Sequence, residues 1–198
     1  MGWTAQRGRD DAAMALEPAA TSPWRTVATR EVYRNPWSVV LEDQLQGRDG
    51  RPGLYGYFAP RDAVLVLPLF PDRSTILVRQ WRYAYGCSSW ELVCGALEDG
   101  EDIVGAAARE LAEEAGLGAA RWTAHGAFHP SDARIGGRTH TFVAEELSDV
   151  AGRLDPSEYD LVRERVPLHE AVQAVQDHRI THVASSYLLL RAARALGI

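Results

Sequence analysis

The chain has 198 residues, of which 46% are hydrophobic and 24% charged, and its formal net charge is −6. This composition excludes an intrinsically disordered chain, a collagen-like repeat and a coiled-coil rod. The acidic balance argues against binding to nucleic acid or to anionic membranes, and no stretch approaches the roughly 18 apolar residues of a membrane-spanning helix. With two cysteines and no secretory signal, we expect a cytoplasmic protein whose partners include neither nucleic acid nor membrane.

The N-terminal region divides into a leader and a strand meander. Residues 1–22 have no sustained apolar period and contain Gly2, Gly8 and Pro18, with Pro23 following, so we predict a flexible leader. We expect one domain over the remaining residues, 23–198, with a meander at 23–59 and a core at 60–198. The meander is predicted to be antiparallel, with a Gly-rich turn at 47–53 and strands at 26–33, 37–42 and 54–58.

The core mixes strands and helices, which predicts an α+β fold. Its apolar patterns indicate strands at 63–70, 75–83, 90–94, 122–128 and 139–144. The first of these is a continuous apolar run and is expected to be a buried central strand, with 75–83 as its hairpin partner. Helices are expected at 102–115, 168–177 and 183–196. Gly116 is a natural residue to end the first helix.

The first predicted helix carries an acidic cluster. Glu110 lies three residues before Glu113 and four before Glu114, so all three carboxylates share one region of the helix surface. Like charges at this spacing destabilise an isolated helix, and a divalent cation removes that cost. Mg²⁺ prefers oxygen ligands from one or two carboxylates, completed by water and substrate phosphate. The alternative is an ordinary acidic helix that faces solvent.

The surrounding pattern favours the metal-binding interpretation. Gly95 is followed after five residues by Glu101, and after seven more by Arg109, which opens an Arg-Glu-apolar-any-Glu-Glu-any-Gly-apolar run. From average residue usage, such a pattern arises by chance on the order of once in 10⁷ chains of this length. The segment at 95–117 resembles the Nudix box without a mismatch.

The resemblance extends from residue 32 to the C-terminus and points to one branch of the family. Residues 77–83 followed by 90–92 are similar to the approach to the box in ADP-ribose and nucleotide-sugar pyrophosphatases. Residues 33–37 and the turn near residue 50 are similar to the N-terminal meander of that branch. The resemblance implies a Nudix-type α/β/α sandwich with a mixed sheet. It also implies hydrolysis of a nucleoside diphosphate linked to another moiety, which gives a nucleoside monophosphate and a phosphorylated sugar.

The family pattern implies a set of metal ligands. Glu110 and Glu114 match the direct Mg²⁺ ligands, Glu113 lies close by, and the main-chain carbonyl of Cys94 is a further possible ligand; Mn²⁺ can substitute for Mg²⁺. Arg109 falls in the catalytic motif, where, with Glu101, it is expected to tie the loop to the helix.

Several residues are candidates for the general base. The branch tends to supply it from an acidic loop before the last strand and helices, where Glu158 is our first choice and Asp160 the second. The same loop can also be read as a simple polar turn. Glu113 or Glu114 can instead activate the water, as happens elsewhere in the family.

Three residues are expected to bind substrate. Arg82 matches an arginine that holds the diphosphate or terminal ribose in the resembling branch, and Arg79 lies beside it. Strand alternation sends Arg82 to one face and Arg79 to the other. Trp37 can stack on the base. The alternatives are a surface strand position for Arg82 and a core position for Trp37.

The loop after the box bears on the identity of the substrate, and the meander bears on the assembly. Where the branch carries a Pro-Gly-centred loop, this chain has residues 129–138, with two arginines and two glycines, so the substrate can be ADP-ribose or another nucleotide sugar. The alternatives are an unusual nucleotide, a nucleoside triphosphate, or a non-catalytic nucleotide-binding role. The resemblance also implies a homodimer in which each meander contributes to the partner's pocket.

Overall fold

We describe the protein from a computed structural model, for residues 21–130, 133–151 and 159–198. The predicted leader lies almost wholly outside these residues. The strands are β1 (Trp24–Arg34), β2 (Val39–Gly47), β3 (Pro52–Phe58), β4 (Ala63–Pro68), β5 (Ser74–Arg82), β6 (Cys87–Glu91), β7 (Val93–Ala96), β8 (Leu117–Phe128), β9 (Thr139–Asp149) and β10 (Val162–Pro167). The helices are α1 (Ile103–Glu110), α2 (Leu168–Gln176) and α3 (Val183–Leu196), with short helical turns at Tyr83–Tyr85 and Leu111–Ala115. In these residues, every helix is too short or too polar to cross a bilayer.

The strands form three sheets, in the orders β1-β2-β3, β10-β5-β6 and β7-β4-β9-β8. The pair β4–β9 is parallel and the other neighbouring pairs are antiparallel, so the core sheet is mixed. The predicted hairpin between 63–70 and 75–83 is wrong. Both edges of β4 are occupied by β7 and β9, so β5 pairs with β6 and β10, and one isolated bridge between Leu69 and Thr75 remains.

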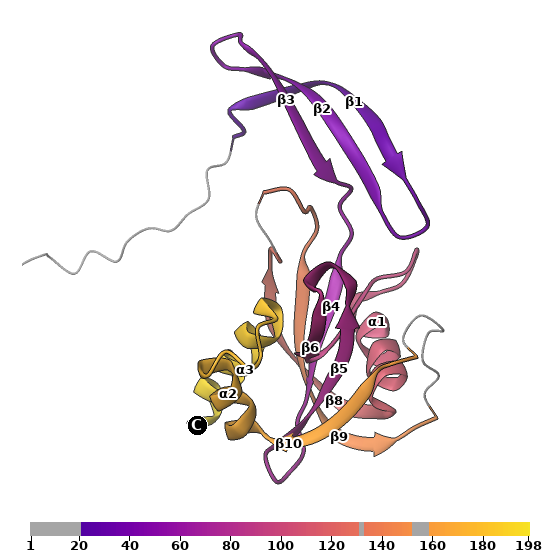
Figure 1. Ribbon diagram of the computed structural model, residues 1–198, viewed down its shortest axis with the longest axis vertical. Helices are drawn as coiled ribbons and strands as arrows, with labels where there is room; N and C mark the ends of the chain where they lie inside the picture. The colour runs from indigo at the N-terminus through magenta and orange to yellow at the C-terminus, as the bar shows by residue number, and fades with distance from the viewer. Residues whose placement is uncertain (1–20, 131–132, 152–158) are drawn as a thin grey trace, which may run out of the picture.

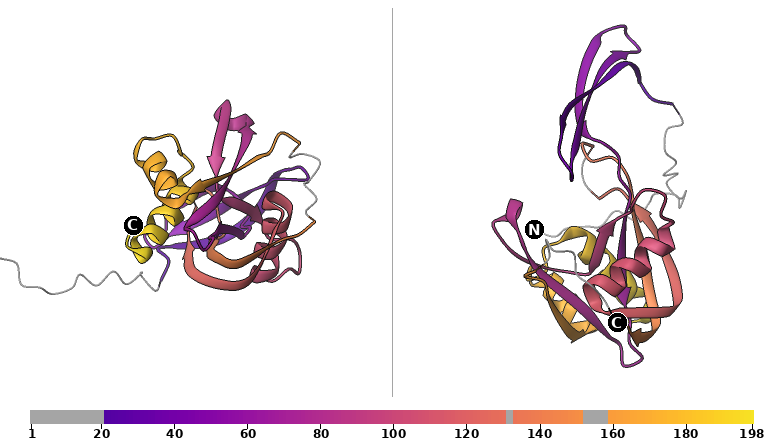
Figure 2. Two further views of the ribbon diagram at one scale, coloured as in Figure 1. Left: turned by 90° about the horizontal axis from the view of Figure 1, so that it is seen from below. Right: turned by 90° about the vertical axis from the view of Figure 1, so that its right-hand side faces the viewer.

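The four-stranded sheet is covered on both faces, by α1 on one side and by α2 and α3 on the other (Figures 1 and 2). Alternation along β4 builds the two apolar layers. Val64 and Val66 pack in the layer under α1, and Leu65 and Leu67 pack in the layer under α2 and α3. This arrangement confirms the predicted α/β/α sandwich and places α1 directly against the centre of the sheet.

The N-terminal sheet confirms the predicted antiparallel meander and extends away from the core (Figure 1). Its junction with the core is made by the loop that departs from the family pattern. Phe58 N donates to the carbonyl of Arg134 at 2.9 Å, and the Tyr55 hydroxyl donates to the carbonyl of Ala133. Gly137 has a φ of +90°, and a side chain there would lie 2.3 Å from the Arg61 carbonyl oxygen. The glycine therefore permits this close approach.

Candidate active site

The acidic helix is fixed at both ends. Asp102 caps α1, because its Oδ1 accepts hydrogen bonds from Val104 N at 3.0 Å and Gly105 N at 2.9 Å. After Glu110 the helix continues as the π-helical turn Leu111–Ala115, and it ends at Gly116 with a φ of 68°. Turns of this kind occur often at functional sites because they shift side chains relative to the helix face. Here the shift falls within the acidic cluster.

Two of the three carboxylates are buried against β7. Glu110 is 7% exposed and Glu114 is 1% exposed. Glu114 Oε2 accepts a hydrogen bond from Cys94 N at 2.9 Å. A side chain at Gly95 would lie 1.7 Å from Glu110 Oε1, so this carboxylate occupies space that glycine leaves open. Gly95, the first position of the sequence pattern, thus leaves the space that the buried carboxylate of Glu110 occupies.

Arg109 joins the loop to the helix, as the sequence predicts. It donates to both Glu101 oxygens, at 2.9 and 3.0 Å, and to the Ala96 carbonyl at 3.0 Å. Its Nη1 also reaches Glu110 Oε1 at 2.8 Å and Glu113 Oε2 at 3.0 Å. These hydrogen bonds raise the pKa of Arg109, with Glu101 as the largest contributor, and hold the pKa of Glu101 below its usual value.

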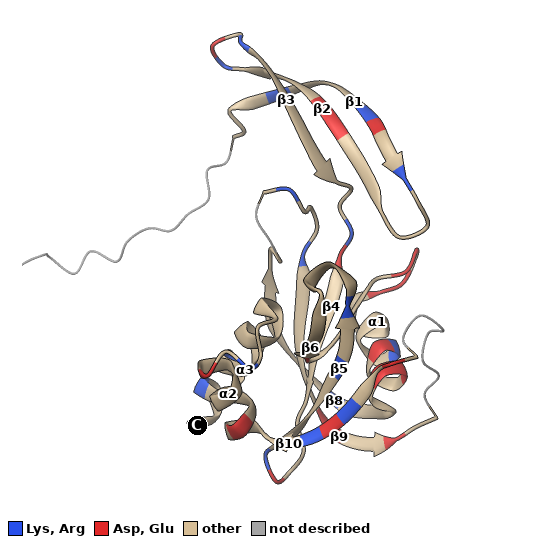
Figure 3. Ribbon diagram, viewed as in Figure 1, with Lys and Arg blue, Asp and Glu red and all other residues tan. Residues whose placement is uncertain are grey.

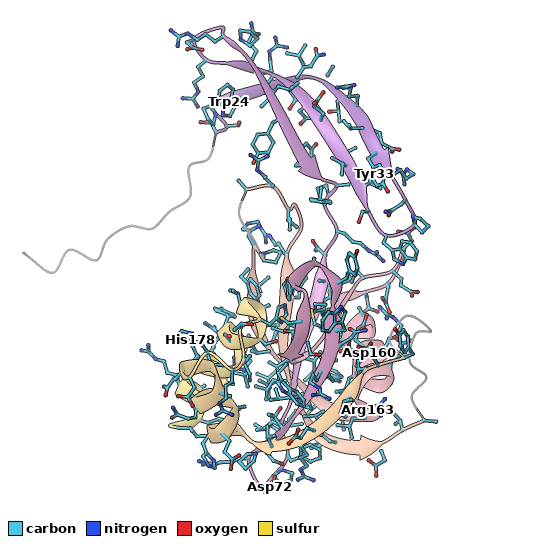
Figure 4. The ribbon with its side chains drawn as sticks, viewed as in Figure 1. Trp24, Tyr33, Asp72, Asp160, Arg163 and His178 are labelled. Carbon is cyan, nitrogen blue, oxygen red and sulfur yellow. The ribbon has the colours of Figure 1, made fainter. Side chains whose placement is uncertain are left out.

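Arg163 of β10 is a further contact that the sequence reasoning missed. Its Nη2 donates to the Glu113 carbonyl at 2.9 Å, and its Nη1 lies 2.8 Å from where a side chain at Gly116 would begin. A guanidinium at this position satisfies a carbonyl at the end of the helix. Figure 3 shows the acidic residues at the end of α1 and in the turn Leu111–Ala115 near the basic residues of β10, and Figure 4 labels Arg163. No local pattern marks this residue, because the contact spans 50 positions.

Arg82 and Glu91 form a second charged pair, across β5 and β6. Arg82 Nε donates to Glu91 Oε1 at 3.0 Å, and its Nη2 donates to Oε2 at 2.7 Å. Burial alone would raise the pKa of Glu91, but the Arg82 hydrogen bonds and the charges of His182 and Arg82 outweigh it and lower the pKa. These three residues and Cys94 line a hollow of about 420 Å³.

Cys94 connects the two charged clusters. Its backbone N–H donates to Glu114, and the residue lines the hollow with Arg82. Burial raises the pKa of the thiol to about 12, and the charges of Glu114, Glu91 and Glu110 act in the same direction. The thiol is therefore protonated near neutrality and is a poor nucleophile.

Arg79 and Trp37 lie away from this hollow. The guanidinium of Arg79 stacks over Trp90 at 5.4 Å from the ring centroid, on the opposite strand face to Arg82. Trp37 is 78% exposed, in the turn between β1 and β2. It lines a separate groove of about 760 Å³ that also borders Arg61 and the box residues Leu97, Glu98 and Asp99. The structure thus places Arg82 near Glu114 of the acidic cluster, whereas Trp37 lines a separate groove.

Of the two candidate general bases in the acidic loop, the structure describes only one. Glu158 lies outside the described residues. Asp160 uses Oδ2 to accept a hydrogen bond from Trp81 N at 2.8 Å, one residue before Arg82. Its label in Figure 4 lies on the side of the core that carries α1. Asp160 therefore anchors the end of the acidic loop to β5.

The carboxylates around α1 are ligands of the type that a hard divalent cation prefers, although they do not surround a single point. Among the described residues, no three His, Cys, Asp or Glu side chains are close enough together to hold a metal ion. Arg109 instead contacts Glu110 and Glu113. Within the described part of the chain, the two linked clusters contain five carboxylates and three guanidiniums: Glu91, Glu101, Glu110, Glu113 and Glu114 with Arg82, Arg109 and Arg163. The buried carboxylates of Glu110 and Glu114 are oxygen ligands of the kind that a hard divalent cation prefers.

Comparisons with known proteins identify the family of this chain. The NUDIX domain model matches residues 59–186, and the model of the nucleoside diphosphate sugar hydrolase N-terminal domain matches residues 24–58. An ADP-ribose pyrophosphatase of Bacillus subtilis (strain 168) is 29% identical over 175 residues, which cover 85% of this chain and 94% of that protein. A methanol dehydrogenase activator of Bacillus methanolicus is 28% identical over 176 residues, with the same coverage.

A third relative and a solved structure also match this chain. The ADP compounds hydrolase NudE of Escherichia coli (strain K12) is 37% identical over 92 residues, which cover 44% of this chain and 48% of that protein. A crystal structure of an ADP compounds hydrolase superimposes with a TM-score of 0.77 at 23% identity, over 91% of this chain and 99% of the other, and so shows the same fold. With the family model spanning most of the chain, this protein belongs to the Nudix hydrolase family.

Proposed function

We propose that this enzyme hydrolyses the pyrophosphate bond of ADP-ribose or a related nucleoside diphosphate sugar in a reaction that depends on Mg²⁺. The observation that carries the proposal is the burial of Glu110 and Glu114 on one helix, against the strand that holds Cys94 and Gly95. Relatives named for hydrolysis of ADP-ribose and ADP compounds support the substrate class.

Glu110, Glu114 and the carbonyl of Cys94 would hold the cation, with Glu113 beside them. Bound there, Mg²⁺ or Mn²⁺ would neutralise the diphosphate and lower the pKa of the attacking water. Arg109 keeps Glu110 and Glu113 in place through its hydrogen bonds to both and to Glu101. Binding of the cation by Glu110 requires that its carboxylate share the Arg109 contact.

The substrate would extend from the acidic helix in two directions. Arg82 lies in the hollow next to Cys94 and is suited to a phosphoryl oxygen, because its guanidinium remains partly exposed despite the pair with Glu91. The groove between Trp37 and the box residue Glu98 offers an aromatic face for a base. Arg79 would act only indirectly, through its stacking on Trp90.

Proton transfer would come from the acidic loop before β10. Glu158 is our first candidate for the base, and Asp160, held at Trp81 N, anchors the loop near the substrate-binding strand. A carboxylate from this loop can accept a proton from water that attacks phosphorus. Glu113 and Glu114 remain the alternative bases.

The assembly is proposed to be a homodimer formed through the N-terminal sheet. Large apolar side chains on this sheet are exposed, among them Trp24, Val27, Val32, Tyr33 and Leu54. A second copy of the chain that covers this surface would remove them from water. In the predicted division of the chain into a meander at 23–59 and a core at 60–198, the meander would therefore form the contact between subunits.

A substrate panel with and without Mg²⁺ tests the function. ADP-ribose, other nucleotide sugars, dinucleotides and nucleoside triphosphates are incubated with the enzyme, and release of nucleoside monophosphate is measured. We expect monophosphate release from ADP-ribose or a nucleotide sugar that stops when the cation is chelated. Preference for a triphosphate would replace the substrate class. Tight nucleotide binding without turnover of any compound would favour a regulatory role.

A further inference from the structure

His182 is a half-buried histidine in the Arg82 hollow for which the family pattern gives no role. It lies at the start of α3, with a side chain that is 19% exposed, yet the ring makes no capping hydrogen bond to the helix backbone. Its Nδ1 lies 2.8 Å from the hydroxyl of Ser185. Glu91 Oε2 is 3.6 Å from the same nitrogen, which is beyond hydrogen-bond distance. The ring is therefore oriented chiefly by Ser185.

The hydrogen bonds of Ser185 favour the tautomer of His182 that carries its proton on Nε2. The Ser185 hydroxyl is fully buried, and its oxygen accepts a hydrogen bond from Leu92 N at 2.8 Å. Its single hydrogen has no other partner among the described residues, so the 2.8 Å contact favours donation from Ser185 to His182 Nδ1. An acceptor at Nδ1 places the ring proton on Nε2. Burial also lowers the pKa of His182, more than the charge of Glu91 raises it, so the ring is neutral near pH 7.

The protonated edge of the ring is the one available to a ligand. His182 lines the hollow with Arg82, Glu91 and Cys94, and its Nε2 makes no hydrogen bond to any described residue. Glu91 is already engaged by two hydrogen bonds from Arg82. The hollow therefore combines the guanidinium of Arg82 with the neutral imidazole N–H of His182. The charge of the Glu91 carboxylate between them is neutralised by Arg82. Two such donors suit a group rich in acceptor oxygens.

The hollow lies beside the acidic cluster, because Cys94 of β7 lines the hollow and is hydrogen-bonded to Glu114. Glu114 holds Cys94 N, and Arg82 is close enough for the charge of Glu114 to raise its pKa. A diphosphate placed on Glu110 and Glu114 would thus extend a phosphoryl group toward Arg82 and His182.

We propose that His182 is a substrate-binding residue whose neutral Nε2–H donates a hydrogen bond to a non-bridging oxygen of the diphosphate, beside Arg82. Ser185 is a positioning residue that fixes the tautomer. This inference rests on the proposed function, since it requires a diphosphate at the acidic helix. It adds a contact from α3 to a site otherwise built from β5, β7 and α1.

The test uses two substitutions that place an amide at different ring positions. His182→Gln can return an N–H near the Nε2 position, whereas His182→Asn reaches only as far as Nδ1. A hydrogen bond to a charged group contributes about 1.5–3 kcal/mol, so we expect His182→Asn to weaken kcat/KM and the binding of α,β-methylene-ADP-ribose by about 10- to 100-fold. His182→Gln should retain most of both. His169→Asn, on the exposed surface of α2, is the matched control.

A spectroscopic measurement separates positioning from general structure. ¹⁵N chemical shifts of the His182 ring should show Nε2 protonated and Nδ1 unprotonated at pH 7, and Ser185→Ala should mix the tautomers in a protein that remains folded. Protonation at Nδ1 would overturn the inference. Unchanged analogue binding in folded His182→Asn would also overturn it. If the wild-type enzyme still hydrolysed ADP-ribose, the proposed function would stand without this inference. Failure of the wild type both to bind the analogue and to hydrolyse the panel would overturn both proposals.

Discussion

The core sheet and the N-terminal sheet bury their apolar residues to opposite degrees. Val64, Leu65, Val66 and Leu67 of β4 are fully buried, whereas all eleven residues of β1 are exposed. The core strand is covered by helices on both faces, and the N-terminal strands have sheet neighbours but no covering layer among the described residues. The core can therefore be stabilised by its own chain, while the N-terminal sheet is expected to gain stability from a second chain.

The two regions also differ in how they hold polar side chains. Arg109 in the core is partly buried and contacts three carboxylates and a carbonyl. In the N-terminal sheet, Arg30 pairs with Glu42 across the strands, and most of the Arg30 side chain is exposed. Exposed pairs of that kind contribute little to stability, whereas loss of one partner from a buried network is costly. Substitutions in the core should therefore affect catalysis and folding more strongly than substitutions in the sheet.

The largest effect is expected at Glu114. Glu114→Gln keeps the shape of the side chain but removes the charge proposed to hold the cation, so kcat should fall by about 10³-fold, equivalent to several kcal/mol of transition-state stabilisation. The amide oxygen can still accept from Cys94 N, so the fold should persist. Monophosphate release and the thermal unfolding midpoint are measured together. Glu170→Gln, at an exposed position of α2, is the control. Turnover at the wild-type rate in Glu114→Gln would contradict the metal assignment.

The second effect concerns the glycine beneath Glu110. Gly95→Ala places a methyl group 1.7 Å from the present position of Glu110 Oε1, so the carboxylate must move. We expect kcat/KM to fall by about 10²-fold, because a displacement near 1 Å in a catalytic group has that effect. The free energy of unfolding should fall by about 1–3 kcal/mol.

Gly56→Ala is the matched control from the N-terminal sheet. The nearest atom to its added methyl group is the Leu41 carbonyl oxygen at 4.0 Å, an ordinary contact. Its kcat/KM should stay within threefold of wild type, a change of under about 1 kcal/mol. Equal losses in the two alanine variants would show that the core is no more sensitive than the sheet.

The third effect tests whether the exposed sheet is an interface. Val27→Asp combined with Val32→Asp introduces charges where a dimer would bury apolar side chains, so light scattering should show monomers. We expect kcat/KM to fall by about tenfold if the partner's strands complete the substrate pocket. Leu190→Asp, at an exposed position of α3, should leave the oligomeric state unchanged. A wild-type protein that is monomeric at micromolar concentration would contradict the homodimer.

The sequence was most informative where contacts are local. Asp102 and Gly116 bound the helix as the propensities predict, and the tie between Arg109 and Glu101 spans eight residues. Alternation placed Arg82 and Arg79 on opposite strand faces, which the structure confirms. The π-helical turn at Leu111–Ala115 was not predicted, because helix formers favour it no more than a regular α-helix.

The remaining features depend on long-range pairing. Strand β10 is rich in charge and mostly exposed, so no apolar pattern marks it, and it forms because it pairs with β5. Arg163 and His182 reach the site only through this pairing and through the docking of α3. The hairpin error has the same origin, since the edge of β4 is taken by β9, more than 70 residues away in sequence. Local rules cannot decide between competing strand partners.

The smallest effect is a pH dependence that should belong to the core. Burial lowers the pKa of His182 below its usual value near 6.5, so the folded protein binds fewer protons than the unfolded chain once the pH falls below that value. Its contribution to stability is complete above pH 6.5 and is lost as the pH falls through the folded pKa; Glu91, whose pKa is also lowered, acts the same way below about 4.5. Urea unfolding should therefore give a lower free energy at pH 5 than at pH 7, and His182→Gln should reduce that difference while His169→Gln should not. The exposed pair of Glu31 and Arg34 in the N-terminal sheet is screened by solvent, so Glu31→Gln should leave the slope unchanged. An undiminished difference in His182→Gln would show that this histidine does not titrate as a buried group.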